Sequence, residues 1–278
     1  MDVFKTTPIF VVGSGRNGTR TIMKLLSGFD SVEIHHEYLC THIQPWAAKY
    51  FMGKASRHEI TDVFRSLHGA AIWYSNAEFW VDCSNKLSWI IEPILEVFPG
   101  AKFVHLVRDG RKVANSYFKK LTAEIYDDEC VQVLQNWLDH DHLPEPPPEK
   151  KYWWNIPQSG QPFYQEFRKF NQFERCCYQW AESNRVILQS LENIPKNQKF
   201  FVRLEDMVSQ KTVLTEFLDF FCISYSDDLF DFLRTPQNVI FPMDFPLTPV
   251  QKRQFNHIAR DMMIRLGYAE REEYIVRY

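Results

Sequence analysis

The chain has 278 residues, of which 45% are hydrophobic and 15% aromatic, enough apolar surface for one large folded domain. Its 32 basic and 35 acidic residues give a net charge of −3, which argues against a general polyanion binder such as a nucleic-acid-binding protein. We therefore expect any basic site to occupy only a small part of the surface.

The distribution of apolar residues and cysteines bears on where the protein works. No apolar run reaches the roughly 18 to 20 residues of a membrane span, and the N-terminal residues carry no signal-peptide pattern. The six cysteines are scattered without a CxxC pair, which indicates free thiols, a reducing compartment and no structural zinc site. We expect a cytoplasmic protein, monomeric or homodimeric, that binds neither membranes nor nucleic acid.

An apolar strand, a glycine-rich loop and the start of a helix follow one another between Pro8 and Leu26. Residues 9–12 form a continuous β-branched and aromatic run, which is typical of a strand buried on both faces of a parallel sheet. The glycines allow a tight turn and close approach to a ligand, and apolar residues at helical spacing predict a helix over residues 19–26. The free amides at such a helix start favour an anion, most often a phosphate.

This loop departs from the Walker A motif of proteins that hydrolyse ATP or GTP. Gly13 and Gly18 have the required spacing, but Thr19 and Arg20 occupy the positions of the motif's Lys and of its Ser or Thr. Without the lysine and the hydroxyl that binds magnesium, the loop suits metal-bridged hydrolysis poorly. Short glycine motifs are weak signals, so a strand, turn and helix without a ligand is the alternative.

Strands and helices alternate along the rest of the chain, which predicts a single-domain α/β fold with a central parallel sheet. Two helices are expected within residues 38–74 and another directly after Arg108. The apolar residues of the helix predicted at 166–191 recur at helical intervals, as expected of core packing. The remaining strands are predicted at residues 32–35, 79–83, 101–107 and 199–204, and the remaining helices at 87–98, 211–221, 229–233 and 249–266.

Polar residues follow two of the predicted strands. His35, His36 and Glu37 end the second strand, and Arg108 begins a basic segment directly after the fourth. Ligands of an open parallel sheet lie beyond the carboxyl ends of its strands. We therefore expect these residues to share one rim of the sheet with the glycine loop.

A proline-rich segment at residues 139–165 contains six prolines among several aromatic residues, which predicts a long irregular loop or lid. Trp153, Trp154 and Phe163 favour a cover over an apolar substrate pocket, because exposed together they would form an unusual apolar patch. A loop that only crosses the surface is the alternative.

Two segments, in this order and on these elements, resemble the cofactor-binding segments of the sulfotransferases: VVGSGRNGTRTIMKLL and FVHLVRDGRKVANSYF. Three further segments resemble that family more weakly and extend the resemblance over nearly the whole chain: CCYQWAESNRVI, FFVRLEDMVSQKTVLTEFLDFF and LTPVQKRQFNHIARDMMIRLGY. The resemblance implies a five-stranded parallel α/β fold like that of the P-loop nucleotide kinases. It also implies the donor 3′-phosphoadenosine-5′-phosphosulfate (PAPS), with 3′,5′-adenosine bisphosphate (PAP) as product and no metal.

The resemblance also implies which residues hold the donor. Arg16 matches the basic residue that contacts the 5′-phosphosulfate, where a guanidinium offers forked donors and cannot lose its proton. Arg108 and Ser116 match the pair that holds the 3′-phosphate; a surface salt bridge and an ordinary helix serine are the alternative. The residues expected to wrap the 5′-phosphate are Asn17, Gly18, Thr19, Arg20 and Thr21.

The catalytic base has more than one candidate. Glu37 resembles the carboxylate that carbohydrate-type, tyrosyl-protein and bacterial sulfotransferases place after the second strand. His35 and His36 are rivals, and both could equally be polar residues at a strand end. The histidine of the cytosolic aryl and steroid enzymes falls at about Lys86, which is either a second cation beside the sulfuryl group or an exposed lysine.

The chain departs from the family pattern at three places. Arg20 stands where the family often has a second Thr, and Leu204 stands where cytosolic members have a tyrosine that touches the adenine. The Arg-x-Gly loop that contacts the 3′-phosphate has no clear counterpart between Arg234 and Pro249. The adenine contacts and the third 3′-phosphate contact are therefore unassigned.

Together these features predict in-line transfer of a sulfuryl group to a hydroxyl or amine of a small acceptor such as a natural product. The alternatives are a P-loop kinase for a small molecule and a nucleotide-binding protein without activity. The acidic run at residues 127–129 either attracts a cationic acceptor or forms a solvated turn.

Overall fold

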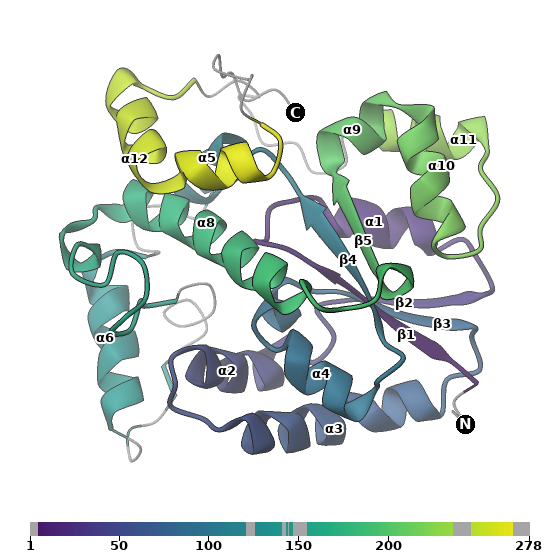
Figure 1. Cartoon of the computed structure of the whole chain (residues 1–278), viewed down its shortest axis with the longest axis horizontal. Helices are drawn as coiled ribbons and strands as arrows, with labels where there is room; N and C mark the ends of the chain where they lie inside the picture. The colour runs from purple at the N-terminus through teal and green to yellow at the C-terminus, as the bar shows by residue number, and fades with distance from the viewer. Residues whose placement is uncertain are drawn as a thin grey trace.

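Five parallel strands form one sheet in the computed structural model, in the order β2-β3-β1-β4-β5 (Figure 1). The structure describes residues 5–120, 126–140, 143, 145–146, 155–235 and 246–268. The predicted α/β fold with a central parallel sheet is therefore confirmed. The strands are β1 (Thr7–Val12), β2 (Val32–His36), β3 (Phe79–Cys83), β4 (Lys102–Val107) and β5 (Lys199–Arg203).

Helices cover both faces of the sheet, because successive side chains of a strand point to opposite faces. Ile9 and Val11 of β1 join the core beneath one group of helices, and Phe10 and Val12 join the core beneath the other. All four side chains are fully buried, as the apolar run predicts. The first group comprises α1 (Thr19–Leu26), α9 (Leu204–Ser209), α10 (Lys211–Asp219) and α11 (Asp227–Arg234), and the second α2 (Cys40–Phe51), α3 (Arg57–Trp73), α4 (Ile91–Val97) and the C-terminal part of α8 (Gln172–Ser190).

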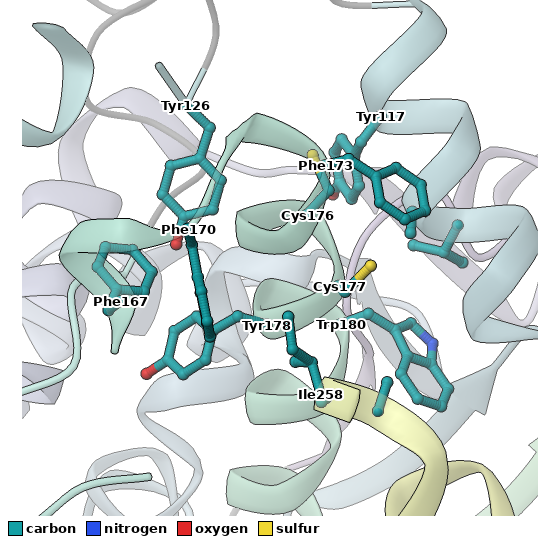
Figure 2. Packing of buried hydrophobic residues seen from close by; sticks show 14 of the residues in the cluster. Tyr117, Tyr126, Phe167, Phe170, Phe173, Cys176, Cys177, Tyr178, Trp180 and Ile258 are labelled. Carbon is teal, nitrogen blue, oxygen red and sulfur yellow. The ribbon is translucent and has the colours of Figure 1, made fainter. Parts of the chain in front are cut away.

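A third core lies beside the sheet around α8, where α5 (Gly110–Lys120), α6 (Asp128–Asp139) and α12 (Pro249–Arg265) pack against that helix (Figure 1). Figure 2 shows aromatic residues of this core: Tyr178 and Trp180 project from α8 itself, and Tyr126 comes from a neighbouring segment. The expectation that the apolar residues of this helix pack in the core is confirmed.

Several helix boundaries differ from the predicted ones, because of a proline in one case and a side-chain cap in another. The helix predicted at 87–98 is divided into a 3₁₀ turn, η1 (Asn85–Trp89), and α4. Pro93 lies in the first turn of α4, where a proline is tolerated, whereas in one continuous helix its ring would clash with the carbonyl of the residue four before it. Similarly, α8 begins six residues later than the predicted 166, because Asn171 and Glu174 form a capping box.

Two helices, α6 and α9, were not predicted. The acidic run at 127–129 begins α6: the Asp127 side chain accepts the Cys130 amide hydrogen at 2.8 Å, and Asp128 pairs with the buried Arg175 at 2.5 Å. These carboxylates lie at a helix N-terminus, where negative charge is favourable. In this structure the run is therefore a helix start and not a solvated turn.

The last helix begins and ends as predicted. Thr248 caps it with Gln251, and Gly267 follows it with a φ of 80°, a conformation that glycine adopts without strain.

None of the helices in the described part of the chain is long and apolar enough to span a membrane. All six cysteines are free thiols.

Gly110 provides a test of how tightly the third core holds the rim of the sheet. A Cβ at Gly110 would lie 2.6 Å from the Trp180 ring, which is fully buried and whose Nε1 donates to the Arg108 carbonyl at 3.1 Å. Gly110→Ala should therefore lower the free energy of unfolding in urea by about 1–3 kcal/mol. Gly100→Ala, with no atom within 4 Å of its Cβ, is the control and should change little. Equal stability of the two variants would contradict this packing.

Candidate functional site

Hydrogen bonds tie the loop after β1 to three other elements: η1, β4 and α5. The Ser88 hydroxyl accepts the Gly13 amide hydrogen at 3.1 Å and donates to the Gly13 carbonyl at 2.9 Å. Asn17 Nδ2 donates to the Leu106 carbonyl of β4 at 2.6 Å, and the Tyr117 hydroxyl donates to the Ser14 carbonyl at 2.9 Å. The loop conformation is therefore fixed by the protein itself.

The same loop presents backbone amides to an incoming anion. Gly15, Arg16 and Gly18 have φ values of 79°, 55° and 103°, so the backbone curls repeatedly through the left-handed region. Gly18 is the N-cap of α1 and offers no side chain to its first amides. These amides suit a phosphate group, as the sequence predicts.

The basic segment after β4 lies directly against this loop. Arg16 Nε donates to Ser116 Oγ at 3.2 Å, and Arg108 Nη1 donates to the Arg16 carbonyl oxygen at 3.1 Å. The structure thus brings together the two segments that the sequence placed on one rim. Both arginines keep partly exposed side chains there, so positive charge is concentrated at this end of β1 and β4.

Glu37 and Lys86 form an ion pair on the other side of the loop. Lys86 Nζ lies 3.3 Å from Glu37 Oε1 and 3.1 Å from Asn85 Oδ1. Lys86 is only 3% exposed, and this burial lowers its pKa to about 8, although Glu37 acts in the opposite direction. Of the two interpretations of Lys86, the one that makes it an exposed lysine is therefore wrong.

Asn85 connects this pair to the glycine loop. A Cβ at Gly15 would lie 2.8 Å from Asn85 Nδ2 and 2.1 Å from the Tyr117 hydroxyl, so this position has no space for a side chain. Glu37, Lys86, the loop and the segment containing Arg108 are therefore a continuous set of neighbours at the carboxyl ends of four strands.

The two histidines at the end of β2 point in opposite directions, as successive residues of a strand do. His36 Nε2 lies 3.2 Å from the Thr19 hydroxyl at the start of α1. Burial is the main cause that lowers the pKa of His36, which keeps the ring neutral. His35 instead bonds Glu33 at 3.0 Å, away from the loop. Of these two histidines, only His36 lies beside the glycine loop, where a catalytic base alternative to Glu37 would have to be.

Asp82 is a site neighbour that the sequence reasoning missed. It is fully buried in β3, and its Oδ1 accepts the Tyr38 amide hydrogen at 3.2 Å, in the turn where Glu37 and Leu39 adopt φ values of 58° and 45°. Burial raises the pKa of Asp82 to about 7, although the amides of Tyr38 and Glu37 oppose the rise. An aspartate inside the apolar strand FWVDC was the available signal.

For the other residues that the sequence predicts to contact the sulfuryl-donating nucleotide, those contacts remain predictions. Asn17 is fully buried and its side-chain amide nitrogen donates to β4, so in this conformation its side chain is turned into the protein. Arg20 is exposed and Thr21 is half-buried. Leu204, which replaces the adenine-contacting tyrosine, lies 2.9 Å from where a Cβ of Gly18 would be, so it packs on the loop.

The predicted lid is described only in part. Phe163 packs against Phe170 and Tyr178 in the third core, with ring centroids 5.6 Å and 6.4 Å apart. Trp153 and Trp154 lie outside the described residues, as does most of the segment searched for an Arg-x-Gly loop. A covering role for this segment therefore stays a prediction.

The described residues fit a phosphorylated nucleotide. Two arginines, a buried lysine and the amides at the start of α1 supply positive charge and donors for phosphate oxygens. Among the described residues, no group of three or more His, Cys, Asp and Glu could hold a metal ion.

Comparison with known proteins points to one family. Residues 8–143 match the sequence profile of the sulfotransferase family, and none of the curated proteins compared with the chain matches it. A sulfotransferase from Alicyclobacillus acidocaldarius shares the fold, with a TM-score of 0.53, 13% identity and coverage of 94% of either chain. Sulfotransferase STF9 from Mycobacterium avium has a TM-score of 0.54 and 12% identity, over 94% of this chain and 77% of its own.

The match over residues 8–143 supports a sulfotransferase family, in agreement with the resemblance of the two segments that follow β1 and β4. It likewise supports a sulfotransferase activity. The donor, the acceptor and the roles of individual residues are separate questions.

The raised pKa of Asp82 predicts a pH-dependent stability. The folded chain keeps the Asp82 proton up to about pH 7, whereas the unfolded chain releases it near the ordinary value of 3.8. Folded wild-type protein therefore loses stability relative to Asp82→Asn as the pH rises through this interval, since asparagine cannot ionise and still offers an oxygen to Tyr38.

Urea unfolding of both proteins from about pH 4 to about pH 8 measures this difference directly. The free energy of unfolding of Asp82→Asn minus that of the wild type should increase across the interval and level off above it. A difference that stays constant with pH would show that Asp82 is ionised throughout.

Proposed function

We propose that this protein transfers a sulfuryl group from PAPS to a hydroxyl or amine of a small acceptor molecule. The observation that carries the proposal is the contact between Arg16 and Ser116, 3.2 Å from Nε to Oγ. It joins the two segments that would hold the phosphate groups at opposite ends of one nucleotide. Arg108, bonded to the Arg16 carbonyl at 3.1 Å, adds a second guanidinium at the same place.

The positions of Glu37, Lys86 and Arg16 suit in-line transfer. The donor supplies a sulfuryl group activated by its bond to the 5′-phosphate. Glu37 accepts the proton of the acceptor as the bond to sulfur forms and the bond between sulfur and the phosphate oxygen breaks. Arg16 neutralises the charge that develops on the leaving phosphate, and protonated Lys86 places a further positive charge beside Glu37.

The ion pair with Lys86 gives Glu37 a fixed orientation before an acceptor arrives. Lys86 is held by Asn85 at 3.1 Å, which itself abuts the glycine loop, so the carboxylate is tied to the phosphate-binding elements. His36 is the alternative base, because its neutral ring lies beside Thr19 at 3.2 Å. The acceptor is proposed to be partly apolar or cyclic, such as a natural product, on the aromatic composition of residues 139–165 alone.

Glu37→Gln tests the assignment of the base. Glutamine keeps an oxygen for Lys86 but cannot take a proton, so turnover should fall by about a hundredfold or more while the affinity for PAP changes little. The measurement is transfer of labelled sulfuryl from PAPS across a metabolite panel, with PAP affinity from calorimetry. Glu33→Gln, the same substitution within β2 and beside Ser75 and His35, is the matched control.

Unchanged turnover in Glu37→Gln would remove Glu37 from this role and turn attention to His36. Magnesium-dependent turnover of ATP by the wild type, with no sulfuryl transfer, would instead assign the kinase activity considered above. Binding of PAP without any transfer would leave a nucleotide-binding protein.

Arg108→Ala tests the proposed hold on the 3′-phosphate. Loss of one charged contact should weaken PAP binding by about ten- to a hundredfold but leave the affinity for adenosine 5′-phosphosulfate, which lacks the 3′-phosphate, nearly unchanged. Calorimetry with both nucleotides gives the two affinities. Lys112→Ala removes a positive charge from the following helix, α5, and serves as control. An equal loss for both nucleotides would exclude the proposed role of Arg108.

A further inference from the structure

Three consecutive residues where β5 meets α9 contact three different parts of the chain. Arg203 Nη1 donates to the Gly267 carbonyl at 2.8 Å, beyond the end of α12. The Leu204 side chain packs on Gly18 of the phosphate-binding loop. The Glu205 carboxylate lies beside the segment that follows β4. This junction therefore links the C-terminal end of α12 to both nucleotide-binding segments.

The two oxygens of Glu205 accept hydrogen bonds from different partners. Oε1 accepts the Asp109 amide hydrogen at 3.0 Å, and Oε2 accepts the Tyr268 hydroxyl at 2.8 Å. The Tyr268 side chain is only 2% exposed, with the Arg203 guanidinium 5.7 Å from its ring centroid. Burial, reinforced by Glu205, raises the pKa of Tyr268 far above neutrality, so its hydroxyl remains a donor.

The peptide group between Arg108 and Asp109 is consequently held from both ends. Its carbonyl oxygen accepts Trp180 Nε1 at 3.1 Å, and its N–H donates to Glu205. A peptide plane fixed at both ends sets the direction in which the Arg108 side chain leaves the backbone. Tyr268 holds the second oxygen of the same carboxylate and so restrains its orientation toward the Asp109 amide.

We propose that Glu205 and Tyr268 are positioning residues that orient Arg108 toward a phosphate group of the bound nucleotide, so that the C-terminal end of α12 sets the affinity for a 3′-phosphorylated donor. The inference rests on the proposed function, because it presumes that Arg108 meets the 3′-phosphate. Neither residue needs to touch the nucleotide itself. Their effect passes through the backbone of one peptide group.

Tyr268→Phe removes the hydroxyl and nothing else, so the fold should survive. Calorimetry with PAP and with adenosine 5′-monophosphate should show PAP binding about five- to tenfold weaker and monophosphate binding within about twofold of the wild type. Tyr225→Phe, which removes a surface hydroxyl bonded to Asp227 at 2.6 Å, is the matched control and should change neither affinity.

The same substitution in an Arg108→Ala background separates positioning from a general structural role. If Tyr268 acts through Arg108, the double variant should bind PAP no more weakly than Arg108→Ala alone. A further five- to tenfold loss, or equal losses for both nucleotides in the single variant, would overturn the inference.

Failure of the proposed function has a different signature. A wild-type protein that binds PAP no more tightly than the monophosphate would overturn the donor assignment, and the positioning inference with it. A wild type that prefers PAP, together with a Tyr268→Phe variant that keeps the full preference, would overturn only the positioning role.

Discussion

The candidate site is built around positive charge concentrated where the first and fourth strands end side by side. There the Arg16 side chain donates to Ser116, and the Arg108 side chain donates to the Arg16 carbonyl oxygen. The buried Lys86 lies close to the same loop, paired with Glu37. Cations this close repel one another unless hydrogen bonds or an anion compensate. In this chain Glu37 compensates Lys86, while the amides at the start of α1 leave room for phosphate. The arrangement is therefore organised for an anionic ligand.

The supports of this rim are buried polar side chains. Ser88, Asn17 and Tyr117 fix the glycine loop from η1, the loop itself and α5, and Asp82 fixes the turn that carries Glu37. A rim already held by such bonds need not reorganise when charge moves during a reaction, which is where electrostatic catalysis gains most. Where a Walker A loop has its lysine, this chain has Thr19, and the arginines proposed to meet the phosphate groups come from two segments.

The two halves of the chain contribute differently. The sequence match to the sulfotransferase family ends at residue 143, so it contains all the residues proposed to touch the nucleotide. The residues proposed to support them, Trp180, Glu205 and Tyr268, lie beyond residue 143. Contacts through backbone groups place little demand on local sequence pattern, which explains why such supports are hard to recognise from motifs.

The sequence alone determined the sheet, the glycine-rich loop after its first strand and the resemblance to the sulfotransferases, because these depend on local patterns: apolar runs, glycine spacing and helix caps such as Thr248. It also placed Glu37 and Arg108 at one rim, since all parallel strands end on the same side. Only the tertiary structure decided that Lys86 is buried against Glu37, that His35 points away, and that Asp82 and Tyr268 support the site. Those facts depend on contacts between segments far apart in the chain, where burial and partner, not residue type, set the role of a side chain.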